Sequence, residues 1–351
     1  MNFASDNTAA IAQDILQGIA RANESFALGY GNDDLTRNVA RRIGDIFGRE
    51  AAVFFVTTGT AANALSLAQV TPPWGAVLCH AESHIATDEC GAPEFFGGGL
   101  KLIGLSGEGC KLKPDAVAAA IEKYSGHRPH QVNAGALSLT QATEAGTVYR
   151  VEEIAALAEI AHTRGLKVHM DGSRFANALV GLNATPAQAT WQAGIDVLSF
   201  GATKGGALAA EAVVFFDPGI ADTMHERRKR GGHLLSKHRF LAAQFDAFLA
   251  DDCWLRLARH ANRLAWKLGE GLAAAGFAPV WPVEANLVFI ILPKRIEAKL
   301  KAAGASYYVR GSGSLPAGRV VGPDEALLRL VTSFSTRAEE VDRFVDLVRN
   351  P

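Results

Sequence analysis

The sequence is poor in cysteine and has no two cysteines at C-x-x-C spacing. Its four cysteines stand far apart in a chain of 351 residues, at Cys79, Cys90, Cys110 and Cys253. This spacing excludes a small disulfide-stapled fold and a cysteine-based zinc site. A reducing, cytoplasmic compartment is therefore the expected location.

Long hydrophobic runs and an excess of charge of either sign are also missing. No apolar stretch approaches the roughly 20 residues that cross a bilayer, and the start, MNFASDNTAAIAQDIL, lacks the basic and apolar regions of a signal peptide. The formal net charge is −1, so we expect no membrane contact and no nucleic-acid partner. The basic run RRKR at 227–230 indicates a solvated helix end first, and a contact with a small anion second.

Several motifs that would identify other enzyme classes are absent. No G-x-G-x-x-G follows a strand, and neither a Walker P-loop nor a G-x-S-x-G elbow occurs. His80, Glu82 and His84 lie close together in HAESH, but this is not H-E-x-x-H and it follows an apolar strand. We therefore predict no metal site.

Short apolar runs alternate with helical segments along most of the chain, which predicts an α/β fold with a largely parallel sheet. The expected strands are 51–56, 75–80, 135–140, 166–170, 196–200 and 212–216. Helices are expected at 35–47, 60–69, 151–164 and 185–193.

The length exceeds the roughly 250–300 residues that one hydrophobic core usually supports, so two domains are expected. We predict a large α/β domain over 1–245 and a smaller α+β domain over 246–351. The smaller domain would contain helices at 254–275, 294–303 and 336–349, strands at 287–292 and 327–334, and a glycine-rich loop at 311–318.

The stretch TTGTAAN at 57–63 lies between a strand and a helix. A helix N-terminus offers free backbone N–H groups and the positive end of the helix dipole, so this turn suits one phosphate. An ordinary cap by Thr58 or Thr60 is the competing interpretation.

Two further motifs place charged side chains after predicted strands. Asp171 and Arg174 occur in HMDGSR, and Lys204 occurs in SFGATKGG, surrounded by small residues. Open α/β sheets bind ligands at the carboxyl ends of their strands. An aspartate there can pair with a protonated pyridine nitrogen, and a lysine there can attack an aldehyde. A structural ion pair for Asp171 and an exposed loop position for Lys204 are the alternatives.

Together, these motifs resemble the low-specificity L-threonine aldolase family. The resemblance is carried by TTGTAAN, HAESH, TDECGAPEFF, TQATEAGTVYR, HMDGSRF and SFGATKGG, and extends from SDN at residue 5 to RLVTSF near 334. The bacterial branch that includes phenylserine aldolases is similar. The resemblance implies the aspartate-aminotransferase (fold type I) architecture, with a mostly parallel seven-stranded sheet in the large domain. It also implies the cofactor pyridoxal 5′-phosphate (PLP).

The resemblance also implies roles for individual residues. Lys204 would hold PLP as a Schiff base, Asp171 would contact the pyridine nitrogen, and His84 would stack on the ring. Residues of the cofactor site would further include Gly59, Thr60, Arg174 and Lys237, although Lys229 competes with Lys237 for the phosphate. Ser5, Arg174 and Arg329 would bind the substrate carboxylate.

Two other positions follow from the same resemblance. Tyr30 would reach the site of a neighbouring subunit, which implies a homodimer or homotetramer. His130 would stand near the substrate hydroxyl. The general base could then be His84, His130 or a water that they orient.

The implied activity is cleavage of L-threonine or L-allo-threonine, and of related β-hydroxy-α-amino acids, to glycine and an aldehyde. The alternatives are a phenylserine aldolase or another PLP-dependent lyase acting on β-substituted amino acids. In each case the partner is a small amino acid.

Overall fold

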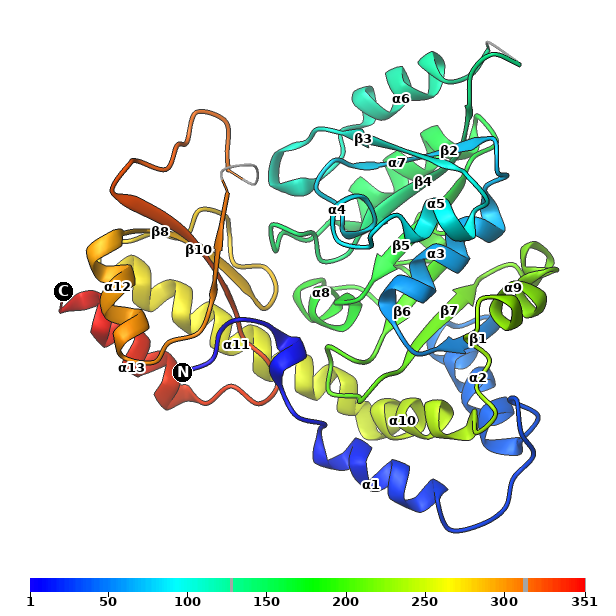
Figure 1. Ribbon diagram of the computed structural model, residues 1–351, viewed down its shortest axis with the longest axis horizontal. Helices are drawn as coiled ribbons and strands as arrows, with labels where there is room; N and C mark the ends of the chain where they lie inside the picture. Colours follow the sequence, from blue (N-terminus) through cyan, green and yellow to red (C-terminus); the bar gives the residue numbers. More distant parts are fainter. Residues whose placement is uncertain (127–128, 312–314, 351) are drawn as a thin grey trace.

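A seven-stranded sheet forms the centre of the larger part of the protein (Figure 1). The computed structural model describes residues 1–126, 129–311 and 315–350. The strand order is β1-β7-β6-β5-β4-β2-β3, and only β7 runs antiparallel to its neighbours. The strands are β1 (Ala52–Val56), β2 (Gly75–His80), β3 (Lys101–Leu105), β4 (Asn133–Thr140), β5 (Lys167–Gly172), β6 (Val197–Gly201) and β7 (Glu211–Phe215). The predicted mostly parallel sheet is confirmed.

Helices cover both faces of this sheet, because its inner strands are buried and carry apolar side chains on both faces. In β1, Phe54 packs with α3 on one face, whereas Phe55 belongs to the core on the other. The helices of this part are α1 (Gln13–Ala22), α2 (Asp34–Phe47), α3 (Gly59–Val70), α4 (His84–Thr87), α5 (Ala92–Phe96), α6 (Pro114–Lys123), α7 (Val151–His162), α8 (Phe175–Gly181), α9 (Met224–Arg230) and α10 (Arg239–Leu249).

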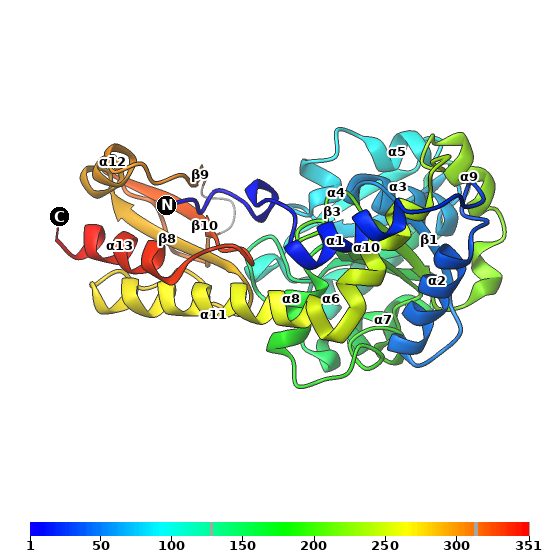
Figure 2. The ribbon, with the colours of Figure 1, turned by 90° about the horizontal axis from the view of Figure 1, so that it is seen from below.

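A second, antiparallel sheet of three strands lies beside the first and is covered by three helices (Figure 2). It contains β8 (Leu287–Pro293), β10 (Glu325–Val331) and β9 (Tyr308–Arg310), in that order. Its helices are α11 (Cys253–Ala274), α12 (Lys294–Ala302) and α13 (Ala338–Arg349). Among the described residues, no helix is long and apolar enough to cross a membrane.

Two segments join the larger and smaller parts. The N-terminal segment packs with the smaller sheet, because Phe3 is buried in its core and accepts a hydrogen bond from the Val331 N–H at 2.8 Å. Helix α11 contributes Leu257 to the large core and Leu268 to the small one. The cores therefore meet along α11, whereas α10 packs entirely with the large core. The sequence predicts separate domains over 1–245 and 246–351, and their independent folding stays a prediction.

Two sequence-based expectations for individual elements differ from the structure. Strand β3 was not among the expected strands, because it is a half-exposed edge strand without an unbroken apolar run. The helix expected at 185–193 is wrong: this stretch forms turns and a short 3₁₀ turn at Trp191–Ala193. There Thr190 Oγ1 donates to the Pro186 carbonyl at 2.6 Å and Gln188 Oε1 accepts from the Thr185 N–H, and such local bonds compete with a helix.

Candidate active site

The carboxyl ends of the parallel strands face a cavity of about 440 Å³, which the smaller sheet closes on its other side. Strand ends of the large sheet supply Asp171 and Lys204. The N-terminal segment supplies Ser5, and the smaller sheet supplies Arg329. Residues from four distant parts of the chain thus meet at the edge where sheets of this type bind ligands.

Asp171 is a buried carboxylate at the end of β5. Its Oδ1 accepts from the Ser173 N–H at 2.9 Å, and its Oδ2 accepts from Asn63 Nδ2 at 2.9 Å. Burial alone would raise the pKa of Asp171, but the nearby positive charges of Lys204 and His84 lower it below its ordinary value. The carboxylate is therefore ionised at neutral pH and fixed in place.

Lys204 lies in the tight turn that follows β6. Gly205 and Ala207 both donate their N–H groups to the Ala202 carbonyl, and Gly206 has a φ of +125° that favours glycine. Burial and the Arg174 guanidinium lower the pKa of Lys204. A lowered pKa increases the share of neutral amine, the form that attacks an aldehyde.

His84 begins α4 and contacts the buried carboxylate of Glu89, with 2.8 Å between Nδ1 and Oε1. This hydrogen bond raises the pKa of His84. Asn63 Nδ2 bridges Glu89 and Asp171, at 2.8 and 2.9 Å. The ligand atoms of His84, Glu89 and Asp171 lie within 4.8 Å of one another, as in a metal site. The hydrogen bonds through Asn63 and Nδ1 account for this arrangement by themselves.

The N-terminus of α3 lies next to this group. Thr58 is the N-cap, with its Oγ1 accepting from the Ala61 N–H at 3.1 Å, so the capping interpretation is correct. A cap satisfies only part of the first turn, and the helix N-terminus keeps its positive dipole end. A Cβ at Gly59 would lie 3.4 Å from Ser173 Oγ, so this N-terminus adjoins the turn that follows Asp171.

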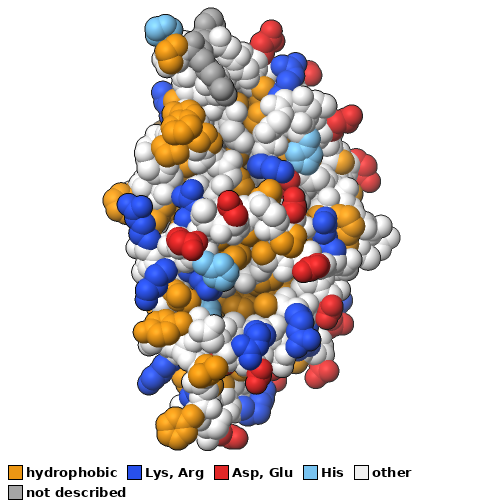
Figure 3. Space-filling view, turned by 90° about the vertical axis from the view of Figure 1, so that its right-hand side faces the viewer, with side chains coloured by type: hydrophobic (Ala, Val, Ile, Leu, Met, Phe, Trp, Pro, Cys, Tyr) orange, Lys and Arg blue, Asp and Glu red, His pale blue; other side chains and the backbone are white. Residues whose placement is uncertain are grey.

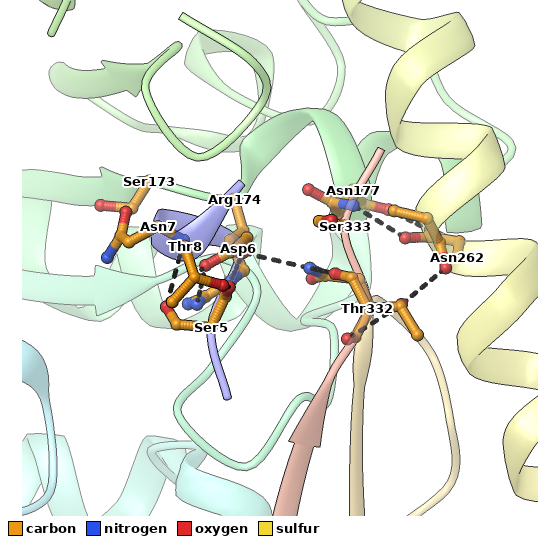
Figure 4. Close-up of polar contacts among 12 residues, drawn as sticks. Ser5, Asp6, Asn7, Thr8, Ser173, Arg174, Asn177, Asn262, Thr332 and Ser333 are labelled. Carbon is orange, nitrogen blue, oxygen red and sulfur yellow. Dashed lines mark hydrogen bonds and ion pairs between the residues drawn. The ribbon is translucent and has the colours of Figure 1, made fainter. Parts of the chain in front are cut away.

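Positive charge gathers at the opposite end of the cavity. Arg174 Nε and Nη2 donate to Asp6 Oδ2 and Oδ1 at 2.7 and 2.9 Å, and Asn286 also donates to Asp6 (Figure 4). This ion pair joins Asp6 of the N-terminal segment to Arg174 and holds the Arg174 guanidinium in one orientation. Arg329 lies on β10, where burial and the like charges of Arg174 and Arg310 lower its pKa to about 10. An anion between these guanidinium groups would relieve that repulsion.

Five predicted site residues do not line this cavity. Gly59 and Thr60 lie beside it at the N-terminus of α3, and the other three lie farther away. His130 is exposed and lies in the turn before β4, whereas the cavity lies at the end of β4. At about 3.3 Å per residue, the eight-residue strand puts His130 more than 20 Å away. Tyr30 and Lys237 lie together on another surface, where the Tyr30 N–H donates to the Ser236 carbonyl and the Lys229 ammonium lies 4.9 Å from the Tyr30 ring.

The basic run of α9 is integrated into the fold. Arg228 is buried and Arg227 Nε donates to Gln69 Oε1 at 3.0 Å. On the face of the molecule at the right-hand side of Figure 1, positive and negative side chains alternate with hydrophobic ones (Figure 3). This mixture does not resemble the basic stripe of a nucleic-acid interface.

Sequence reasoning missed several polar residues of the site. They are Asp6, Asn63, Glu89, Glu144 and Glu211, all of which approach the predicted residues in space. Four of them lie inside quoted motifs: Asp6 in SDN, Asn63 in TTGTAAN, Glu89 in TDECG and Glu144 in TQATEAG. A rule that scored every ionisable residue just after a buried strand would have found Glu144.

The residues present fit PLP. The Lys204 amine, with its lowered pKa, can bind an aldehyde carbon. The ionised Asp171 carboxylate, which lies 2.9 Å from the Asn63 amide, can face a pyridine nitrogen. The N-terminus of α3 can hold a phosphate. The fold and the donor set together define a PLP enzyme of the aspartate-aminotransferase architecture.

Comparisons with known proteins agree with this class. Residues 2–294 match the sequence profile of the family described as beta-eliminating lyase. Two low specificity L-threonine aldolases are similar: that of Pseudomonas aeruginosa is 42% identical over 308 residues (87% of this chain, 88% of that protein), and that of Pseudomonas sp. is 40% identical over 314 residues (89% and 90%). The threonine aldolase structure from Leishmania major has a TM-score of 0.91 and 28% identity, covering 99% of this chain and 98% of that one.

A more distant structure shows the fold alone. The serine palmitoyltransferase of Sphingomonas wittichii has a TM-score of 0.72 and 13% identity, covering 99% of this chain and 86% of that one. The closer matches decide the family. The chain belongs to the beta-eliminating lyase family and, within it, to the low-specificity L-threonine aldolases. The cofactor inferred from the sequence is thereby confirmed.

Proposed function

We propose that the protein cleaves L-threonine and L-allo-threonine, and related β-hydroxy-α-amino acids, to glycine and an aldehyde. The observation that carries this proposal is the meeting, in one cavity, of a lysine of lowered pKa, a fixed carboxylate and two arginines. The similarity to enzymes named as low specificity L-threonine aldolases supports the same reaction.

Five residues would hold the cofactor. The Lys204 amine would bind its aldehyde carbon, Asp171 its pyridine nitrogen and His84 its ring face, and the α3 N-terminus at Gly59 and Thr60 its phosphate. When bound, PLP supplies a conjugated ring that accepts the electron pair of a broken Cα bond. Asp171 is ionised in advance, so no rearrangement of the protein is needed to stabilise that charge.

The substrate carboxylate would lie between Arg174 and Arg329, with Ser5 beside it. The Asp6 pair uses Nε and Nη2 of Arg174, which leaves Nη1 outside that pair. A carboxylate fixed by guanidinium groups defines the orientation of the Cα substituents, and this orientation decides which Cα bond breaks. Arg174 would therefore act at the boundary of the cofactor and substrate sites.

The proposal is tested by the visible spectrum of the purified protein and by acetaldehyde release from L-allo-threonine. We expect a yellow protein whose absorption band is lost on borohydride treatment. Lys204→Ala should lose both the band and the activity. A wild-type protein that binds PLP and releases no aldehyde from any β-hydroxy amino acid would contradict the proposed reaction.

A phenylserine aldolase is the second candidate, and one observation favours it. A smaller cavity of about 220 Å³ adjoins the main one, shares Asp88, Glu144 and Arg310 with it, and is lined by Phe289. Phe289 is the aromatic member of a lining that is otherwise largely charged, and its ring suits a β-phenyl group better than a methyl group. The ratio of benzaldehyde release to acetaldehyde release from matched substrates separates the two candidates, and keto acid production would indicate β-elimination instead.

We further propose a homodimer or homotetramer in the cytoplasm. Leu28 is 69% exposed and Tyr30 is 50% exposed, with Phe26 fully exposed and Lys237 nearby in a surface hollow. Exposed apolar groups of this kind are typical of a subunit interface. In such an assembly, Tyr30 and Lys237 of one copy would contact the neighbour's cofactor phosphate. The free thiols of all four cysteines support a reducing compartment, and light scattering would give the subunit number.

A further inference from the structure

Glu144 is a carboxyl group in the cavity wall, carried by the turn that follows β4. This turn is firmly held, because Thr143 and Thr147 both donate their hydroxyls to the Gly109 carbonyl, at 3.0 and 2.7 Å. Gly146, with a φ of +80°, packs so closely on Leu287 that a Cβ would lie 2.9 Å from it. The position of the Glu144 side chain is therefore defined by the fold.

The two oxygens of Glu144 have different surroundings. Oε1 accepts from the backbone N–H of His84 at 2.9 Å. Oε2 is buried and has no hydrogen-bond partner among the described residues. The residue lines both the main cavity and the adjoining smaller one. A buried oxygen without a partner carries a desolvation cost, which a hydrogen bond from a ligand hydroxyl at this boundary would offset.

Two carboxylates of the site have a cationic partner in the structure, whereas Glu144 has none among the described ion pairs. Asp6 pairs with Arg174 and Glu89 with His84. Burial, together with the negative charge of Asp171, raises the pKa of Glu144 to about 7. The ionisable groups that face it from the surrounding elements are Cys79, Glu82, His84, Asp88, Tyr149, Asp171 and Arg310.

His84 is less suited to accept a proton. Its Nδ1 contacts Glu89 at 2.8 Å, and this contact raises the pKa of His84, so one of its two ring nitrogens is already engaged by a buried carboxylate. His130 is too far from the cavity. Of the three side chains His84, His130 and Glu144, Glu144 is thus the one that combines a place in the cavity wall with a carboxylate free of a cationic partner among the described residues.

We propose that Glu144 accepts the proton of the substrate β-hydroxyl during cleavage, and returns it when the reaction runs toward condensation. This inference rests on the proposed function. As the O–H bond breaks, its electron pair forms the C=O bond of the aldehyde, and the Cα–Cβ bond breaks with its pair left on Cα. One proton leaves the hydroxyl and one arrives at Cα, so the products are glycine and aldehyde without a co-reactant.

The test compares Glu144→Gln with Glu284→Gln in the PLP-loaded enzyme. Glutamine can still accept from the His84 N–H, but it cannot take up a proton. Glu284 is the matched control, because it also accepts a backbone N–H, that of Val148 at 2.8 Å, and does not line either cavity. We expect aldehyde release to fall by roughly 10²–10³-fold in Glu144→Gln and to stay near wild type in Glu284→Gln.

A second reaction at the same site distinguishes a chemical role from a structural one. Exchange of the glycine Cα proton with deuterated solvent uses the same lysine and cofactor but no β-hydroxyl. NMR should show this exchange unchanged within about threefold in Glu144→Gln, since general-base catalysis at the hydroxyl is not involved. Equal loss of exchange and cleavage would mean that Glu144 only positions His84, and would overturn the proposal.

A third measurement does not depend on turnover. Infrared difference spectra of the cofactor-free protein between pH 5.5 and 8.5 should contain the C=O band of a protonated carboxyl group that is missing in Glu144→Gln. The fall of wild-type kcat/KM below about pH 7 should also be missing in that variant.

If the wild type releases aldehyde and Glu144→Gln is equally active, only this inference fails. If the wild type releases no aldehyde, the proposed function fails with it.

Discussion

The two walls of the cavity are built differently. The wall from the large sheet carries Asp171, His84 and Glu144, each fixed by hydrogen bonds to neighbouring residues. The wall from the smaller sheet carries Arg329 and the edge strand β9, where Tyr308 is 50% exposed and Val309 is 51% exposed. The first wall is held by hydrogen bonds within the large domain, whereas the β9 strand of the second wall is half exposed.

This difference has a physical cause. Adjacent parallel strands end at the same edge, so residues at their carboxyl ends are brought together by the sheet itself. In contrast, β9 is three residues long and pairs only through β10. We infer that the large-sheet wall performs the proton and electron chemistry, whereas the small-sheet wall recognises the carboxylate and the side chain. Substitutions on the two walls should therefore differ in size and in the kinetic constant that they change.

The largest effect is expected for Asp171→Asn on the large-sheet wall. An amide keeps most of the shape but loses the negative charge that would stabilise a pyridinium, so kcat should fall by roughly 10²–10³-fold. Steady-state kinetics and the visible spectrum check this. Asp196→Asn is the control, because Asp196 lies just before β6, at the opposite edge of the sheet, and contacts His162 and Lys167. Comparable losses in both variants would contradict a special role for Asp171.

Glu144→Gln should reveal the stability cost of a buried carboxyl on the same wall. The pKa of Glu144 rises from 4.5 to about 7 on folding. Between these values the folded protein binds more protons than the unfolded chain, so stability falls as the pH rises through this window. A glutamine at this position does not titrate, so the Glu144→Gln variant does not lose stability in this pH window. The variant should be more stable than wild type by about 1–3 kcal/mol at pH 8 and nearly equal to it at pH 4.5.

Thermal unfolding at the two pH values measures this difference. Glu284→Gln again serves as the control, since Glu284 contacts Arg150 at 2.7 Å and its removal should not stabilise the protein. A variant that is less stable than wild type at pH 8 would mean that the Glu144 carboxylate is favourably bound in the folded state.

Arg329→Lys on the small-sheet wall should act mainly on substrate binding. Lysine keeps the charge but cannot donate two parallel hydrogen bonds to a carboxylate, so KM should rise about 10-fold with a smaller change in kcat. The matched test uses L-threonine amide, which lacks the carboxylate charge and should show little difference between variant and wild type. An equal loss with both substrates would show that Arg329 supports the fold and not the carboxylate.

Local sequence patterns place two residues of the large-sheet wall, whereas Ser5 and Arg329 are predicted only through the resemblance and Glu144 is not predicted. Asp171 and Lys204 follow strands whose unbroken apolar runs make their ends easy to place. Asp6 cannot be placed in this way, because its partner Arg174 lies 168 residues away and only tertiary packing brings them together. The roles predicted for these residues stay predictions that the variants above test.

His130 shows how a resemblance can misplace a residue that local reasoning places correctly. It precedes β4, and residues that precede a parallel strand lie at the edge opposite the ligand site. Glu144 follows β4 inside a motif that carries the resemblance, but no local pattern in the sequence marks it as part of the site. Its burial depends on the hydrogen bonds of Thr143 and Thr147 to Gly109, a contact between distant loops.

The smallest effect is expected for Tyr308→Ala on the exposed edge strand β9. Tyr308 pairs with Arg329 in the strand register and lines the cavity while remaining half exposed, so little is desolvated when substrate binds. Its removal should change kcat/KM for L-allo-threonine by less than about threefold, because an exposed contact contributes under about 1 kcal/mol. Val320→Ala is the matched control, because Val320 is also exposed and lines neither cavity. Activity on a β-phenyl substrate should fall further than activity on L-allo-threonine, since the larger side chain reaches this wall. A loss above 10-fold for both substrates would place β9 in the catalytic wall and remove the distinction between the two sides of the cavity.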